Sequence, residues 1–144
     1  MDGIRRLFTG MRASSSGMSA ERVRIDVIAK NLANAEVTRM PDGSGPYRRQ
    51  LVRFEPILQK AEDGKDTVAG VRVAGVEPDT RTPFERVRMP GHPDADADGY
   101  VTMPNVNPTL EMADMITAMR AYEANVNAAD AFVKMAERAL RLAQ

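Results

Sequence analysis

Residues 107–143 read NPTLEMADMITAMRAYEANVNAADAFVKMAERALRLA. Apolar residues recur in this stretch at every seventh position, and again three positions after each of those. The ten positions are Met112, Met115, Met119, Tyr122, Val126, Ala129, Val133, Ala136, Leu140 and Ala143. This spacing places side chains on one stripe of an α-helix, and a seven-residue repeat is typical of a helix that packs against another helix. The pattern predicts a long C-terminal helix with an apolar seam.

Asn107 and Pro108 mark the start of this helix. An asparagine side chain can cap the first free backbone N–H groups, and a proline is well tolerated at the first helical position. From Pro108 to Ala143 the helix would be about 54 Å long at 1.5 Å per residue. That length exceeds what a small globular domain needs, so the sequence indicates a rod-like element.

The N-terminal residues carry a weaker copy of the same repeat. Large apolar residues stand seven apart at Ile4, Met11, Met18, Ile25 and Leu32, with Leu7, Ile28 and Ala35 beside them, while Ser14 and Glu21 interrupt the stripe. The predicted helix over residues 3–35 matches the C-terminal one in length, which favours an antiparallel pair. Glycine costs about 1 kcal/mol inside a helix. Gly10, Gly17 and the three serines at 14–16 therefore predict that this helix frays alone and becomes more helical when these residues are replaced by alanine.

The middle of the chain has a different composition. Residues 40–108 contain all nine prolines and seven of the ten glycines, which excludes a continuous helix. Short stretches rich in β-branched and aromatic residues predict strands of one small sheet at 47–54, 68–76, 84–89 and 100–103. Asn34 is expected to end the first helix in a left-handed conformation, with Pro41 preventing continuation. The fold class is therefore α+β: an antiparallel, coiled-coil-like pair of helices at 1–38 and 108–144, and a small β-rich domain at 39–107.

Charge and composition narrow the function. Lys plus Arg and Asp plus Glu number 20 each, so no net field favours nucleic acid. No apolar run is long enough to insert into a membrane, and residues 1–12 lack the apolar core of a signal peptide. With no cysteine and a single histidine, no catalytic or cofactor-binding constellation is visible, and we expect a protein that is not an enzyme.

One motif resembles a metal site. Asp94, Asp96, Asp98 and Gly99 have the spacing that opens a calcium-binding loop. The position that should supply a bidentate glutamate is Asn105, and prolines stand where flanking helices would begin. We therefore expect an acidic turn without metal, and we interpret His92, between Gly91 and Pro93, as a turn residue.

Several blocks resemble a known family. They are NLANA at 31–35, GPYRRQ at 45–50 with Phe54 following, PGHPDAD at 90–96, GYVTMPNVN at 99–107, and the segments EM at 111–112 and RAYEAN at 120–125. Together they resemble the bacterial flagellar basal-body rod proteins over nearly the whole chain, from about residue 16 onward. The short middle is similar to that of the proximal rod members.

The resemblance implies a structural subunit of the periplasmic rod, which transmits motor torque to the hook and filament. Its implied partners are copies of itself, other proximal and distal rod proteins, the rod adaptor and MS ring at the base, and the flagellar type III export apparatus. Export would then need no cleaved signal peptide. A cytoplasmic coiled-coil adaptor is the alternative that the helical seams alone would satisfy, and a calcium-binding module would account only for the three aspartates.

Both seams are candidates for contacts between subunits, because a two-helix hairpin buries only one stripe of each helix. The alternative is that the seams merely close the hairpin within one chain. The expected assembly interface comprises Ile25, Ile28, Asn31, Leu32, Asn34, Met112, Met115, Met119, Tyr122, Val126, Val133 and Leu140.

Overall fold

The computed structural model describes residues 2–60, 64 and 66–142. A long helix at each end of the chain flanks four strands in the sequence. The order is α1 (Asp2–Ala33), β1 (Gln50–Lys60), β2 (Asp66–Pro78), β3 (Glu85–Arg88), β4 (Tyr100–Met103) and α2 (Pro108–Leu142). The expected α+β architecture with helical ends is confirmed. The seam position at Ala143 lies outside the described residues.

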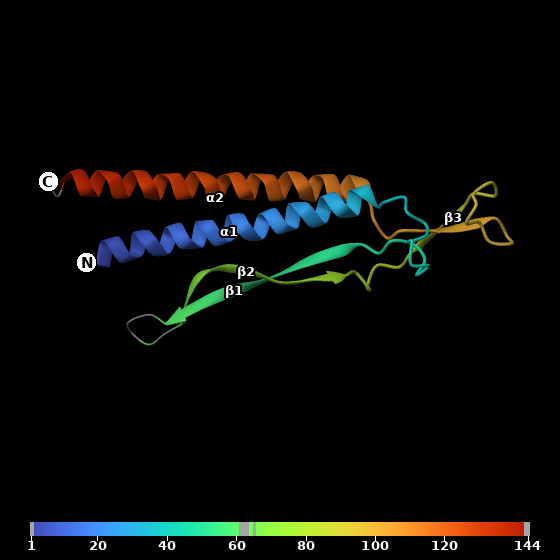
Figure 1. Cartoon of the computed structure of the whole chain (residues 1–144), viewed down its shortest axis with the longest axis horizontal. Coiled ribbons are helices and arrows are strands. Elements are labelled where there is room, and N and C mark those ends of the chain that lie inside the picture. Colours follow the sequence, from blue (N-terminus) through green and yellow to red (C-terminus); the bar gives the residue numbers. More distant parts are fainter. Residues whose placement is uncertain (1, 61–63, 65, 143–144) are drawn as a thin grey trace.

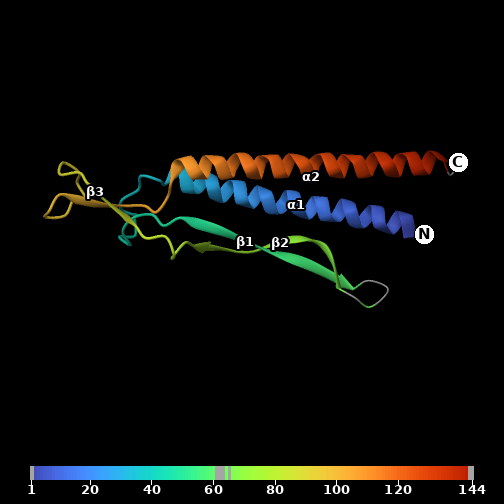
Figure 2. The same ribbon diagram turned by 180° about the vertical axis from the view of Figure 1, so that it is seen from behind.

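Figures 1 and 2 show how these elements are arranged. The two helices run side by side in opposite directions, and α1 lies between α2 and the β1–β2 hairpin. The hairpin extends back along α1 toward the free ends of the helices. The β3–β4 hairpin lies beyond the opposite end of the pair. The helix α1 therefore has two neighbours, whereas α2 packs against α1 alone among these elements.

The helix ends follow from local hydrogen bonding. Asn107 Oδ1 accepts from the backbone N–H groups of Thr109 and Leu110 at 3.0 and 3.2 Å, which confirms the predicted cap of α2. At the end of α1 the expectation was wrong, because no described residue other than glycine has a positive φ. The Asn34 side chain instead donates to the carbonyl of Lys30 at 2.7 Å, and the chain leaves the helix through a series of tight turns.

The middle forms two separate sheets, where a single sheet was predicted. β1 pairs with β2 and β3 with β4, both antiparallel, and no strand joins the two pairs among the described residues. β1 and β2 are longer than predicted and contain two register shifts. A long two-stranded hairpin is marginal in isolation, so its position along α1 explains how it remains ordered.

Small residues on α1 permit close approach on both of its sides. A Cβ built on Gly10 would lie 2.3 Å from the ring of Phe132 on α2, and one on Gly17 would lie 2.8 Å from the amide of Asn125. On the other side, Ser16 Oγ accepts from the backbone N–H of Val71 at 3.1 Å. The glycines therefore serve packing, and the higher helicity expected of the alanine variants stays a prediction.

The seam between the helices is turned relative to the predicted one. Ala118 on α2 is fully buried and Glu111 is 1% exposed, whereas Met112 and Met119 are 58% and 48% exposed. On α1, Ser14 is buried although it interrupts the apolar repeat. Half of the predicted seam of α2 thus faces outward, because small and polar residues take the contact with α1.

None of the helices in the described part of the chain is both long and apolar enough to cross a membrane.

Replacing Gly10 with alanine should lower stability although it improves helix propensity by about 1 kcal/mol. The added methyl group would overlap the Phe132 ring, and overpacking of this kind costs about 1–3 kcal/mol. The free energy of unfolding, followed by circular dichroism, should fall.

The control for this test is the same substitution in a Phe132→Ala background. With the ring removed, Gly10→Ala should become stabilising because only the propensity gain remains. An equal effect of Gly10→Ala in both backgrounds would contradict the contact between Gly10 and Phe132.

Candidate functional site

Asn31 lies at the centre of a buried polar cluster, where the ends of both helices meet the middle segment. Its side chain is 1% exposed. Oδ1 accepts from the Tyr47 hydroxyl and from the backbone N–H of Gln50, both at 2.9 Å. Nδ2 donates to the carbonyl of Gln50 and to Glu111 Oε2, also at 2.9 Å. One amide side chain therefore joins α1, the segment leading into β1, and α2.

Glu111 is the buried charge of this cluster. It stands in the first turn of α2, and Arg49 Nε donates to its Oε1 at 2.6 Å. The two carboxylate oxygens thus bind different partners, Arg49 on one side and Asn31 on the other. Since burying an isolated carboxylate is very costly, the paired guanidinium is the reason that this glutamate can lie in the interior.

Arg49 is itself held by the loops on either side of it. The backbone N–H of Arg49 donates to Asn105 Oδ1 at 2.8 Å, and its backbone carbonyl accepts from the backbone N–H of Asp79 at 2.8 Å. Asn105 Nδ2 donates to the carbonyls of Asp79 and Thr82 at 3.1 and 3.0 Å. We refer to Asn31, Tyr47, Arg49, Asp79, Asn105 and Glu111 as the polar junction.

Two pKa shifts report the electrostatics of the junction. Burial, together with the nearby charge of Glu111, raises the pKa of Tyr47, so its hydroxyl stays a neutral donor to Asn31. The side-chain and backbone hydrogen bonds of Thr82, with further help from the backbone of Arg81 and the charge of Arg49, hold the pKa of Asp79 below its usual range.

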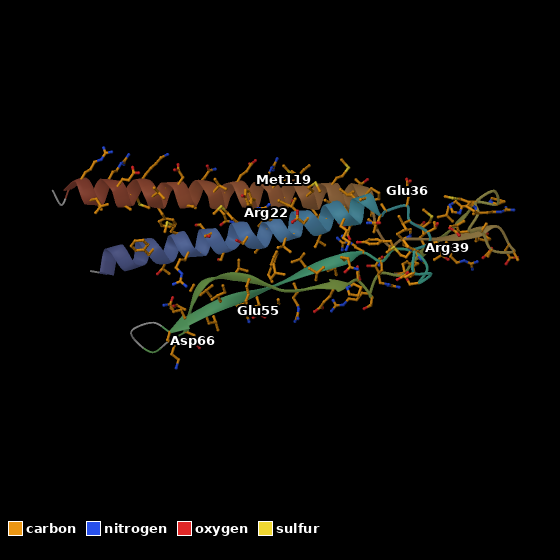
Figure 3. The ribbon with its side chains drawn as sticks, in the orientation of Figure 1. Arg22, Glu36, Arg39, Glu55, Asp66 and Met119 are labelled. Atoms are coloured by element: carbon orange, nitrogen blue, oxygen red, sulfur yellow. The ribbon has the colours of Figure 1, made fainter. Side chains whose placement is uncertain are left out.

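The second feature is an apolar stripe along the outside of α2. Its members are large, share the first position of the seven-residue repeat, and are all exposed: Met112, Met119, Val126, Val133 and Leu140. We call these five residues the outer stripe. Ile116, one turn from Met112, extends it and is also exposed. Figure 3 shows Met119 on α2, with α1 between it and the hairpin that carries Glu55.

The residues predicted for assembly divide between these two regions. Ile28 and Asn31 are buried within the chain, whereas the outer stripe is exposed. Ile25, Leu32, Asn34, Met115 and Tyr122 are partly exposed. The sequence pattern did not identify Tyr47, Arg49, Asn105 or Glu111 as a cluster, because their contacts span 16 to 80 positions and follow no period. The only local signal was a glutamate in the first turn of a capped helix.

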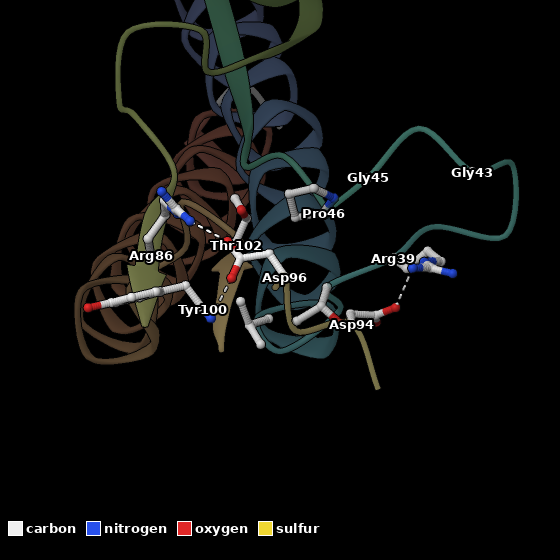
Figure 4. Close-up of a pocket in the computed structure, with 11 residues that line it drawn as sticks. Arg39, Gly43, Gly45, Pro46, Arg86, Asp94, Asp96, Tyr100 and Thr102 are labelled. Carbon is white, nitrogen blue, oxygen red and sulfur yellow. Dashed lines mark hydrogen bonds and ion pairs between the residues drawn. The ribbon is translucent and has the colours of Figure 1, made fainter. Parts of the chain in front are cut away.

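Two of the three aspartates of the calcium-like motif bind protein groups through their carboxylates. Asp94 pairs with Arg39 at 2.7 Å and accepts from the Thr38 hydroxyl at 2.8 Å, as Figure 4 shows for the arginine. Asp96 pairs with Arg86 and caps the turn before Tyr100. Across the described ranges, no group of three or more acidic or histidine side chains is arranged to hold a metal ion. The hollow of about 520 Å³ between these residues is lined by paired charges.

His92 lies in a turn, as predicted. Its backbone N–H donates to the carbonyl of Met89 at 3.0 Å, and its imidazole Nδ1 accepts from the backbone N–H of Asp94 at 3.1 Å. The imidazole therefore accepts a hydrogen bond from its own turn.

A comparison with known protein families identifies the class to which this protein belongs. Residues 11–39 match the family model described as flagella basal body rod protein, and residues 97–142 match that described as flagellar basal body rod FlgEFG protein C-terminal. The two matched segments contain most of α1, all of α2, and Asn31, Asn105 and Glu111 of the polar junction. The class defined by the fold and these matches is that of the flagellar rod proteins, which are structural proteins and not enzymes.

Curated relatives narrow the class. The chain is 42% identical to the flagellar basal-body rod protein FlgC of Borreliella burgdorferi, over 96% of this chain and 98% of that protein. It is 39% identical to FlgC of Bacillus subtilis, over 94% and 97% of the two chains. With FlgC of Salmonella typhimurium the identity is 40% over 91% and 93%. The chain belongs to the FlgC family of flagellar basal-body rod proteins.

Asn31→Ala should destabilise the chain by about 2–3 kcal/mol, because it leaves the Tyr47 hydroxyl and Oε2 of Glu111 without the partner that Asn31 supplies. Asn34→Ala, three residues later, is the matched control. Its side chain bonds only its own helix, so the loss should be about 0.5 kcal/mol or less. Denaturant unfolding measures both, and equal losses would contradict a central role for Asn31.

The lowered pKa of Asp79 predicts that part of the free energy of unfolding is lost at acid pH. Its folded pKa is lowered, so its stabilising effect is complete above the unfolded value of about 4. That effect is lost as the pH falls through the folded pKa. The difference in unfolding free energy between the wild type and Asp79→Asn should therefore shrink between about pH 6 and about pH 2. A difference that stays constant with pH would show that the carboxylate charge is not involved.

Proposed function

We propose that the outer stripe of α2 is the surface through which this rod subunit packs against neighbouring rod proteins, and that the paired helices form the axial core of the rod. The observation that carries the proposal is the exposure of five large apolar side chains in one line along α2. Contiguous exposed apolar surface of this kind marks interaction sites in soluble proteins.

The geometry suits an open helical assembly. An interface between two different faces of identical subunits, repeated by rotation and rise, builds a filament and not a closed ring. The outer stripe and the partly exposed residues of α1, Ile25 and Leu32 among them, supply two such faces. In this proposal residues 1–38 and 108–144 form the axial part, residues 39–107 face outward, and the structure transmits torque along the helices.

The same proposal includes the partners at the base and the route of export. We expect the rod adaptor and the MS ring to contact the first rod subunits, and the flagellar type III apparatus to carry the unfolded chain. In support, the seam between the helices includes Gly10 and Gly17 on α1 and the buried Ala118 on α2, where little apolar area is covered. A seam with so little apolar burial is easily opened, because burial of apolar area is the main stabilising term.

A charge in the outer stripe should block assembly while leaving the chain folded. Met119→Glu alters an exposed side chain, so the free energy of unfolding should change by about 0.5 kcal/mol or less. Buried against a neighbouring subunit, the same carboxylate would be unpaired and costly. Cells with only the variant should be non-motile, and the chain should be missing from purified hook–basal bodies.

The matched control is Ala124→Glu, which places the same charge on an exposed part of α2 away from the outer stripe. It should still be incorporated. Incorporation of Met119→Glu at the wild-type ratio to other rod proteins, measured by mass spectrometry, would refute the proposed interface.

A further inference from the structure

Two different faces of α2 could pack against α1: the face that the apolar repeat predicts and the face that the structure shows. The predicted face centres on the outer stripe and on the row that contains Met115 and Tyr122. The observed face centres on that row and on a second one, seven residues apart, which contains Glu111, Ala118, Asn125 and Phe132. At 3.6 residues per turn these faces differ by a rotation of roughly 50° about the helix axis.

On apolar content alone, the predicted face should win. It would bury two methionine, two valine and one leucine side chains that are 40–67% exposed, in place of one phenylalanine, one alanine, one asparagine and one glutamate. Because burial of apolar area drives helix packing, another interaction must hold α2 in the observed rotation.

From this contrast we infer that Glu111 is a rotational lock: its bonds in the polar junction hold α2 turned so that the outer stripe stays exposed for assembly. The carboxylate bridges Arg49 Nε at 2.6 Å and Asn31 Nδ2 at 2.9 Å. A turn of α2 toward the outer stripe would move Glu111 away from both donors. The Asn31 side chain is held by its bond to Gln50, and the backbone of Arg49 is held by Asn105 and Asp79, which limits how far these donors can follow.

A buried polar cluster is well suited to this task. Buried charge pairs often add little net stability compared with apolar residues of similar size, but they penalise alternative arrangements that separate the partners. A single buried polar residue can fix the register of a helix pair in the same way. At the other end of the pair, the fit of Phe132 over Gly10 favours the same rotation, so the lock needs to act only near the start of α2.

The test uses cysteine labelling, which the cysteine-free chain permits. A single cysteine at position 119 reports on the outer stripe, and one at position 124 reports on a surface that is exposed in either rotation. In the wild-type background both thiols should react at similar rates. In the Glu111→Leu background the thiol at 119 should react about tenfold more slowly, as expected for protection by packing, and the thiol at 124 should be unchanged.

Two further variants guard against misreading. Glu111→Gln keeps the shape of the side chain but has one acceptor oxygen for two donors, so it should slow labelling at 119 less than Glu111→Leu does. If Glu111→Leu fails to fold because Arg49 keeps only its longer ion pairs with Asp79 and Asp114, Arg49→Met with Glu111→Leu removes both charges and should show the same protection. Unchanged or faster labelling at 119 in the folded Leu-containing variants would overturn the lock.

The rotational lock rests on the proposed function only in that the outer stripe is kept exposed for assembly. The lock and the proposed assembly surface can be refuted separately. Rods should lack the Glu111→Leu variant if the turned helix hides the outer stripe. Protection at 119 with normal incorporation into rods would uphold the lock but refute the outer stripe as the assembly surface. Unchanged labelling refutes the lock whatever happens to the rod.

Discussion

The pairing of Glu111 with Arg49 and Asn31 is the constraint on which the rest of the structure depends. A buried carboxylate tolerates very few positions, because each of its oxygens needs a donor and its charge needs a counter-charge. Once Arg49 is fixed by Asn105 and by the backbone of Asp79, the start of α2 has one location and one rotation. The end of α1 follows through Asn31, and the segment entering β1 follows through Tyr47 and Gln50.

Away from the junction, the chain is held by close contacts between small residues. Gly10 and Gly17 let α2 approach α1, while Ser16 and Gly70 let the β1–β2 hairpin approach from the other side. Such contacts bury little apolar area, so the large apolar side chains of α2 remain available on the surface. In the proposed assembly, this division lets polar groups set the geometry of the single chain while exposed apolar groups contact neighbouring subunits.

Membership of the FlgC family gives these features a mechanical meaning. A torque-bearing rod needs subunits whose helices cannot rotate independently, and the polar junction connects both helices to the outer strands at one point. The β3–β4 hairpin beyond that point is stabilised by ion pairs of Arg39 with Asp94 and of Arg86 with Asp96. The acidic motif that resembles a calcium loop is thus part of the turn structure of this hairpin.

The sequence alone determined the two helices, the capped start of α2, the strand at Tyr100–Met103 and the α+β class, because these depend on local periodicity and capping. Its motifs, through their resemblance to rod proteins, were also sufficient to indicate the family. Only the tertiary structure decided which face of α2 meets α1, that the strands form two sheets, and that Asn31 and Glu111 share a buried bond. Those outcomes depend on residues up to 80 positions apart and on paired charges, whose energies no local pattern contains. The apolar repeat identified a helix seam correctly, but a buried carboxylate determined which side of that seam faces inward.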